Sequence, residues 1–193
     1  LRFPGSIDVG QKLVRDLVYA HAAKLARDGF KHIITVGGHG GPRHMVALEE
    51  VAAKVSWRFR GTRMVSATGG MITDMFWGRM TERFAARMKE RGTPLTDEEL
   101  KAIRTDYHAG MIETSLMMVA RPGAVKPGYK DLRPAIVDKP WKITPSSALR
   151  VGGGFGHLGS PHLARLELGE AVADVLMGEL ESKLERFLDG DTK

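Results

Sequence analysis

The fold is decided by the stretch Lys31-His32-Ile33-Ile34-Thr35-Val36-Gly37-Gly38-His39-Gly40-Gly41-Pro42. Its apolar, β-branched run from Ile33 to Val36 is too short for a helix and is typical of a strand buried on both faces. The glycines that follow allow a sharp turn and leave the imidazole of His39 unshielded. Pro42 is a favoured first residue of a helix. The stretch therefore predicts a strand, a loop and a helix, with His39 at the carboxyl end of the strand, where open α/β sheets bind ligands.

Two other interpretations of His39 stay open at this point. A single loop histidine often does no more than bond a backbone carbonyl. A glycine-rich loop after a strand can also cradle a phosphate, but this one lacks the Lys-Ser/Thr ending of a P-loop. The glycines on both sides of His39 favour a ligand-binding role over these alternatives.

Segments on both sides of this stretch complete an alternation of helices and strands. Hydrophobic spacing predicts helices over 9–27, 42–55, 72–90, 96–104 and 116–120, and a last helix that begins at 160–161 and runs to the C-terminus. It also predicts strands over 33–36 and 62–68, and turn residues predict a long surface connection over 122–145. This order is typical of an α/β fold with a mainly parallel sheet flanked by helices. A chain of 193 residues is long enough for one sizeable core, so we expect a single layered domain over 1–193.

A stripe of large apolar residues marks the segment 72–90. Its members recur every four residues and are Phe76, Met80, Phe84 and Met88. Such spacing places them on one face of a helix, where Met and Phe usually pack in a core or a subunit interface. A core is our first interpretation, and an interface is the second.

Composition excludes several classes of protein. The absence of cysteine excludes a disulfide scaffold, a Cys nucleophile and a thiolate metal site. No apolar run reaches membrane-spanning length, and the first residues have neither the charge nor the apolar core of a signal peptide, so a cytoplasmic location is expected and no membrane partner. The net charge of +6 admits nucleic acid, but acidic and basic residues mostly alternate, as on a solvated helix face. A nucleic-acid surface carried by Arg58, Arg60 and Arg63 is therefore only a minor alternative.

A second segment with residues suited to catalysis, two acids and a histidine, is Asp106-Tyr107-His108-Ala109-Gly110-Met111-Ile112-Glu113-Thr114-Ser115. Histidine is the side chain whose ordinary pKa lies near neutrality, and either Asp106 or Glu113 can fix the tautomer of His108, so these residue types suit acid-base catalysis. The alternative is a helix cap made by Asp106, Thr114 or Ser115, with His108 merely nearby.

A third glycine-rich segment formally matches the dinucleotide fingerprint through Gly154, Gly156 and Gly159. The match fails on context, because the region about 20 residues on lies inside a predicted helix instead of ending a second strand with an acidic residue. A nicotinamide or flavin cofactor is not expected.

Four motifs in one order resemble the creatininase (creatinine amidohydrolase) family. They are Phe3-Pro4-Gly5-Ser6-Ile7, Gly37-Gly38-His39-Gly40-Gly41, Asp106-Tyr107-His108-Ala109-Gly110 with Glu113-Thr114-Ser115, and Gly159-Ser160-Pro161-His162-Leu163-Ala164-Arg165-Leu166-Glu167-Leu168-Gly169. Together they span nearly the whole chain.

The resemblance implies a site for one or two divalent metals, zinc, manganese or iron, in a single α/β domain. It implies hydrolysis of a C–N bond in a small cyclic amide or formamide, by a homo-oligomer that is usually a hexamer. By the same resemblance, His39 binds metal, His108 shuttles the proton and Glu113 supports the site. A bound metal in such a site makes water a nucleophile and polarises the amide carbonyl.

This sequence departs from the family pattern at its metal-ligand positions. The family's Glu-x-His pair and following Asp lie upstream of Phe-Pro-Gly, and the sequence, which starts at Leu1, does not include that segment. Met111 stands where many members have a ligand Glu, Gly41 stands where creatininase has a carboxylate, and Gly37 replaces an Asn. Two expectations follow: a preceding segment or a partner chain in a hetero-oligomer supplies the missing ligands, or the chain is a non-catalytic subunit with a structural or regulatory role.

Overall fold

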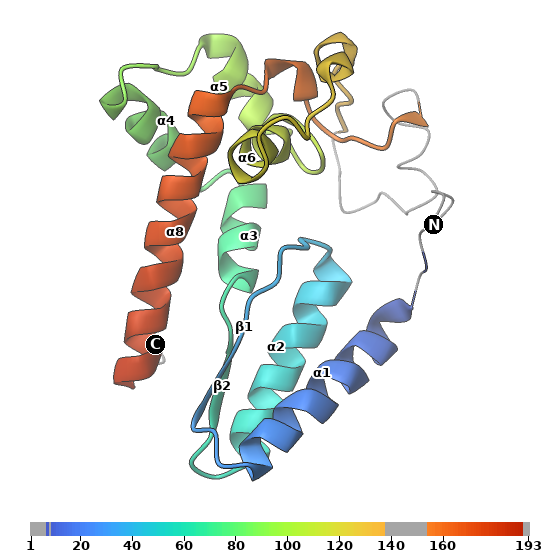
Figure 1. The fold of residues 1–193 in the computed structure, drawn as a ribbon, viewed down its shortest axis with the longest axis vertical. Coiled ribbons are helices and arrows are strands. Elements are labelled where there is room, and N and C mark those ends of the chain that lie inside the picture. The colour runs from blue at the N-terminus through green and yellow to red at the C-terminus, as the bar shows by residue number, and fades with distance from the viewer. Residues whose placement is uncertain (1–6, 8, 138–153, 191–193) are drawn as a thin grey trace. The chain divides into compact units, whose positions relative to one another are not determined.

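The computed structural model describes residues 7, 9–137 and 154–190 and shows a helix-rich α/β fold with a small parallel sheet (Figure 1). Its elements are α1 (Gly10–Arg27), β1 (His32–Thr35), α2 (Pro42–Arg58), β2 (Arg63–Ser66), α3 (Gly69–Phe76), α4 (Thr81–Glu90), α5 (Asp97–Ile103), α6 (Met111–Ala120), the 3₁₀ turns η1 (Pro127–Asp131) and η4 (Pro161–Leu163), and α8 (Leu166–Asp189). The described chain divides into two compact units, Asp74–Met177 and residues 7–73 with 178–190. Among the described residues, no helix combines the length and the apolarity needed to cross a membrane.

The unit of residues 7–73 with 178–190 is built on two parallel strands. β1 pairs with β2 in parallel, as the sequence predicted. His32 lies opposite Arg63, and Thr35 lies opposite Ser66. Helix α1 packs along α2, and α2 packs along β2 (Figure 1). The core between these helices and the sheet contains Ala22, Ile33, Val51, Ala52, Val55 and Met64.

The last turns of α8 lie against the other face of this sheet. Strand side chains alternate between faces, so His32 and Arg63 point away from the buried Ile33 and Met64. The ring of Phe187 lies 5.6 Å from the ring of His32, and the Arg63 guanidinium lies 4.9 Å from the same Phe187 ring. The end of α8 therefore lies against this face but leaves His32 and Ile34 of β1 exposed, so the prediction of a strand buried on both faces was wrong.

This arrangement weakens the nucleic-acid alternative. Arg63 donates hydrogen bonds to the carbonyls of Phe187 and Leu188 at the end of α8. The guanidinium of Arg58 lies 5.8 Å from the centre of the Phe59 ring. Of the three arginines predicted to carry nucleic-acid binding, Arg63 is thus engaged within the fold.

The Asp74–Met177 unit has its own core around α4, α6 and the first half of α8. The buried residues include Met80, Phe84 and Met88, which confirms the core interpretation of the predicted stripe, while the side chain of Phe76 lies outside the described part. The prediction of one helix over 72–90 was wrong. Gly78 adopts φ +68°, and α3 ends before it, so the segment forms two helices joined by a turn.

Two further local predictions can be compared with the fold. The capping box at Thr96 is present: its hydroxyl accepts from Glu99 N at 3.2 Å, and the Glu99 carboxylate accepts from Thr96 N at 2.8 Å. The predicted connection over 122–145 contains η1 and a bridge from Ala135 to Gly159, and its part beyond residue 137 lies outside the described residues. The Phe3–Ser6 motif lies outside them as well.

Candidate functional site

The first predicted site residue, His39, lies in the loop between β1 and α2. The loop is fixed at its start because Gly37 N donates a hydrogen bond of 2.9 Å to Thr68 Oγ1, just beyond β2. At its end, Pro42 begins α2, and His44 N donates to Gly41 O at 2.9 Å. The His39 side chain is exposed at the carboxyl end of β1, as predicted.

A second histidine, His44 in the first turn of α2, contacts His39. The two ring centroids are 5.3 Å apart, and the planes make an angle of 69°. Gly41 makes room for the His39 ring, and Gly37 lies beside the His44 ring. A Cβ on Gly41 would come closer than 3.0 Å to His39 Nε2, and a Cβ on Gly37 would lie 3.6 Å from His44 Nε2. The imidazole of His39 therefore occupies the space into which any side chain at position 41 would project.

The residues of this loop do not complete a metal centre by themselves. Among the described residues, no group of three or more His, Cys, Asp or Glu side chains is placed to hold a metal ion. A catalytic zinc has three protein ligands in addition to water, and this loop offers two imidazoles, His39 and His44. A metal bound here needs at least one ligand from outside the described residues.

The role of Gly41 can be tested without a metal. In Gly41→Ala the new methyl group should displace the His39 ring, while the backbone at φ −62°, ψ 125° accepts alanine without strain. We expect the Hε1 and Hδ2 proton resonances of both His39 and His44 to shift, because each ring lies in the ring-current field of the other. The His21 resonances serve as the control. Unchanged His39 and His44 resonances would contradict this packing.

The second predicted group lies in the Asp74–Met177 unit, where His108 and Glu113 face each other. His108 Nδ1 is 3.5 Å from Glu113 Oε2, and both side chains are about half exposed. Glu113 also accepts a hydrogen bond from Ala109 N. The His108 backbone pairs with Leu158 through bonds of 3.0 and 2.7 Å. Of the two acids predicted to fix the tautomer of His108, the structure thus places Glu113 beside the ring.

Ala109, between His108 and α6, has a left-handed backbone with φ +46°. Residues other than glycine adopt this conformation only when their surroundings hold them in it, and such residues concentrate at functional sites. Here Glu113 bonds to Ala109 N, and the Leu158 bridge fixes His108. The imidazole of His108 is therefore exposed to solvent, while hydrogen bonds hold the backbone of His108 and Ala109 in place.

Asp106 has a different position. Its carboxylate is buried and accepts hydrogen bonds of 2.7 Å from Met111 N and 2.7 Å from Ile112 N, at the start of α6. A further contact of 3.4 Å comes from Ser160 N. Asp106 therefore caps α6, which was the alternative predicted from the sequence, and it joins α6 to the segment before η4. Burial raises the pKa of Asp106 to about 6, although these N–H donors and the helix terminus favour its anion.

Glycines of the third and fourth motifs allow close packing around the Asp106 carboxylate and between α6 and α8. Cβ atoms on Gly110 and Gly159 would both come closer than 3.0 Å to Asp106 Oδ1. A Cβ on Gly169 would come closer than 3.0 Å to the backbone oxygen of Ser115 in α6. These glycines let the chain approach the carboxylate and let α8 approach α6.

Arg165 in the same motif is a structural residue. Its Nε lies 2.6 Å from Glu99 Oε1, and its Nη2 donates to the carbonyls of Thr93 and Pro94 at 3.3 and 3.2 Å. Burial works to raise the pKa of Glu99, but Arg165 and the Thr96 N–H outweigh burial and lower it. Arg165 N also donates to Ser115 Oγ at 3.0 Å. The motif thus ties α5, α6 and α8 together.

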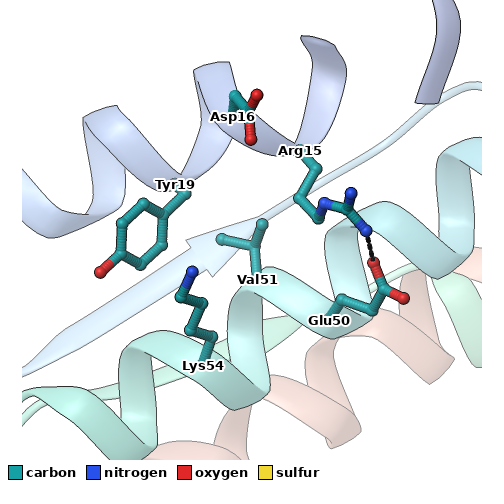
Figure 2. A pocket seen from close by; sticks show the side chains of 6 residues that line it. All are labelled: Arg15, Asp16, Tyr19, Glu50, Val51 and Lys54. Atoms are coloured by element: carbon teal, nitrogen blue, oxygen red, sulfur yellow. Dashed lines mark hydrogen bonds and ion pairs between the residues drawn. The ribbon is translucent and has the colours of Figure 1, made fainter. Parts of the chain in front are cut away.

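A groove between α1 and α2 encloses about 400 Å³ (Figure 2). It is lined by Arg15, Asp16, Tyr19, Glu50, Val51 and Lys54. Arg15 pairs with Glu50 at 2.7 Å, and the Lys54 ammonium lies 4.4 Å from the centre of the Tyr19 ring. The groove's charges satisfy one another, so it does not look like a ligand site.

A hollow of similar size in the other unit is lined by Trp77, Gly78, Arg104 and Tyr107. The Tyr107 hydroxyl donates to Arg104 O at 3.3 Å, and Tyr107 directly precedes His108. This aromatic hollow was not predicted from the sequence.

His44 was also missed by the sequence analysis. Its signal was present as a second imidazole five residues after His39, but spacing alone does not say that two rings across a loop and a helix start will meet. His157 is a further case: it is buried, and Nε2 donates to the Arg133 carbonyl at 2.8 Å. A buried histidine in a glycine-rich segment gives no pattern that distinguishes it from an exposed one.

Solved structures share this fold. A Glu-to-Gln mutant of creatininase in a Zn-Zn form is 18% identical with a TM-score of 0.63, over 96% of this chain and 68% of that one. A Glu-to-Gln mutant complexed with creatine is 19% identical with a TM-score of 0.60, over 96% and 69%. A Trp-to-Ala mutant is 16% identical with a TM-score of 0.58, over 96% and 68%. At these identities the likeness establishes the fold.

Family membership comes from the sequence comparison. No curated protein matches the chain. The family model described as Creatininase: Creatinine amidohydrolase, however, matches residues 1–184, which is nearly the whole sequence. The chain therefore belongs to the creatininase family.

Proposed function

We propose that this chain is a metal-dependent amidohydrolase that hydrolyses a C–N bond of a small cyclic amide or formamide. Family membership supports an amidohydrolase-type activity. The observation that carries the proposal is the exposed His108 beside Glu113, on a backbone fixed by Leu158. A small-molecule partner is in keeping with the fold relative that is complexed with creatine.

His108 is the residue that moves a proton in this proposal. A carboxylate beside Nδ1 favours the tautomer with its proton on Nδ1, which leaves Nε2 to accept or donate the transferred proton. Glu113 is held for this role because it also accepts the Ala109 N–H. Asp106 acts as a positioning residue, since its carboxylate bonds the first N–H groups of α6, the helix that carries Glu113.

His39 is the proposed metal residue. One fold relative is a Zn-Zn form of creatininase, and imidazole and carboxylate ligands suit zinc, manganese or iron. One or two such ions, when bound, supply a nucleophilic water and polarise the scissile carbonyl. The remaining ligands come from outside the described residues, from this chain or from another subunit of a homo-oligomer or hetero-oligomer. We expect the active protein to assemble as a hexamer and to act in the cytoplasm.

The proposal is tested by metal content and hydrolysis measured on the same preparations. Protein purified without added metal should contain about one or two equivalents of divalent metal per chain and should cleave creatinine or another small cyclic amide or formamide. His39→Ala should lose the metal. His108→Asn should keep the metal and lose activity by about 10²–10⁴-fold, the usual contribution of a general acid-base group.

His21→Ala provides the matched control, because His21 is an exposed residue of α1 whose Nδ1 donates to the Leu17 carbonyl at 2.8 Å. It should keep both metal and activity. Protein that holds no metal even after incubation with zinc or manganese would contradict the proposal. That outcome would favour the second candidate, a non-catalytic creatininase-like subunit with a structural or regulatory role.

A further inference from the structure

We propose that His44 is a second imidazole ligand and forms a two-histidine chelate with His39 for a divalent cation. The inference rests on the proposed function, because it concerns the metal that His39 is proposed to bind. Its starting observation is the contact between the two rings, which come from the loop after β1 and from the first turn of α2.

The separation of the rings fits one shared cation. With Zn–N bonds of about 2.0–2.1 Å and tetrahedral angles, the centroids of two coordinating imidazoles lie roughly 5 Å apart. The observed separation of His39 and His44 is 5.3 Å, with the planes inclined at 69°. A shared cation therefore requires no change in the separation of the two ring centres.

The backbone between the two rings is already ordered. His44 N and Met45 N both bond to Gly41 O, at 2.9 and 3.0 Å, and Gly37 N bonds to Thr68 Oγ1. Little backbone entropy is therefore lost when both imidazoles bind one ion. The absence of a side chain at Gly41 leaves the space that the His39 ring fills.

His44 also supplies one of the metal ligands that are missing from this sequence. Gly41 offers no carboxylate, and among the described residues no third group joins the pair. An imidazole from α2 raises the ligand count on this loop from one to two. Two neutral imidazoles favour borderline cations such as zinc over the hard cations magnesium and calcium.

The test uses the full chain in its purified assembly and Zn²⁺ alone as the probe. After removal of bound metal, Zn²⁺ affinity is measured by competition with a chromophoric chelator. Long-range ¹H–¹⁵N spectra then report which imidazole nitrogens shift. We expect His39 and His44 to shift together, and His39→Ala and His44→Ala each to weaken binding at least tenfold.

The double variant should lose less affinity than the two single losses combined, because either single substitution already removes the chelate. His21→Ala should bind like the wild type. His44→Gln repeats the test with a side chain of similar length, and circular dichroism confirms that each variant is folded.

The possible failures are separable. If His44→Ala and His44→Gln bind Zn²⁺ like the wild type while His39→Ala does not, the chelate is wrong and the metal role of His39 stands. If His39→Ala also binds like the wild type, or the wild type binds no Zn²⁺, the chelate and the metal part of the proposed function both fail.

Discussion

Gly169→Ala should destabilise the Asp74–Met177 unit by about 3 kcal/mol, because overpacking against a rigid backbone costs up to this amount or more. The new Cβ would come closer than 3.0 Å to the Ser115 carbonyl oxygen and would also meet Val119 Cγ2. A backbone oxygen inside α6 cannot rotate away as a side chain can, so α6 and α8 have to separate. Urea unfolding followed by circular dichroism measures the loss.

Gly178→Ala is the matched control, because Gly178 lies in the same helix and a Cβ there meets nothing within 4 Å. It should stabilise the protein by about 0.5–1 kcal/mol, the usual gain for replacing glycine by alanine inside a helix. The two substitutions are chemically identical, so their difference reports the contact between α6 and α8. Equal effects of the two would show that α8 does not approach α6 as described.

Asp106→Asn should change how stability depends on pH. Burial raises the pKa of Asp106 from 3.8 to about 6. Between these values the folded protein holds a proton that the unfolded chain has lost, so the free energy of unfolding contributed by this residue falls as the pH rises. At 1.36 kcal/mol per pKa unit, the contribution is present in full below pH 3.8, and about 3 kcal/mol is lost by the time the pH has passed 6.

The measurement is the difference in unfolding free energy between wild type and Asp106→Asn, in urea, at pH 4 and pH 7. We expect the wild type to gain about 2 kcal/mol of unfolding free energy relative to the variant as the pH is lowered from 7 to 4. The full change is not reached there, because the unfolded carboxyl, with a pKa of 3.8, is already partly protonated at pH 4. The difference removes the contributions of all other carboxylates. Asp131→Asn, at an exposed position in η1, should track the wild type at both values. If the wild type instead becomes less stable relative to the variant as the pH is lowered, the N–H groups of Met111 and Ile112 outweigh burial in setting the pKa of Asp106.

Local signals in the sequence were sufficient for much of the fold. The strand and glycine loop around His39 and the capping box at Thr96 depend on residues close in sequence, and both are present. The break at Gly78 was also a local signal, but the regular spacing of Met80 and Phe84 with their neighbours outweighed it and predicted one helix.

The candidate site was harder to predict, because its contacts join distant residues. Whether Asp106 faces His108 or the helix start depends on Gly159 and Ser160, more than 50 residues further along the chain. The meeting of His39 with His44 depends on side-chain rotation, which spacing does not encode. Sequence patterns identified the residue types, and tertiary packing decided which acid accompanies the histidine.

The crowding around Asp106 has a consequence for how this sequence can change. Gly110 and Gly159 leave no room for a Cβ while the carboxylate is present. A side chain at position 110 becomes sterically acceptable only after residue 106 has been shortened, whereas position 159 is further restricted by its φ of +148°. Substitutions at 106 and 110 are therefore epistatic, and the order in which they arise decides whether the intermediate folds.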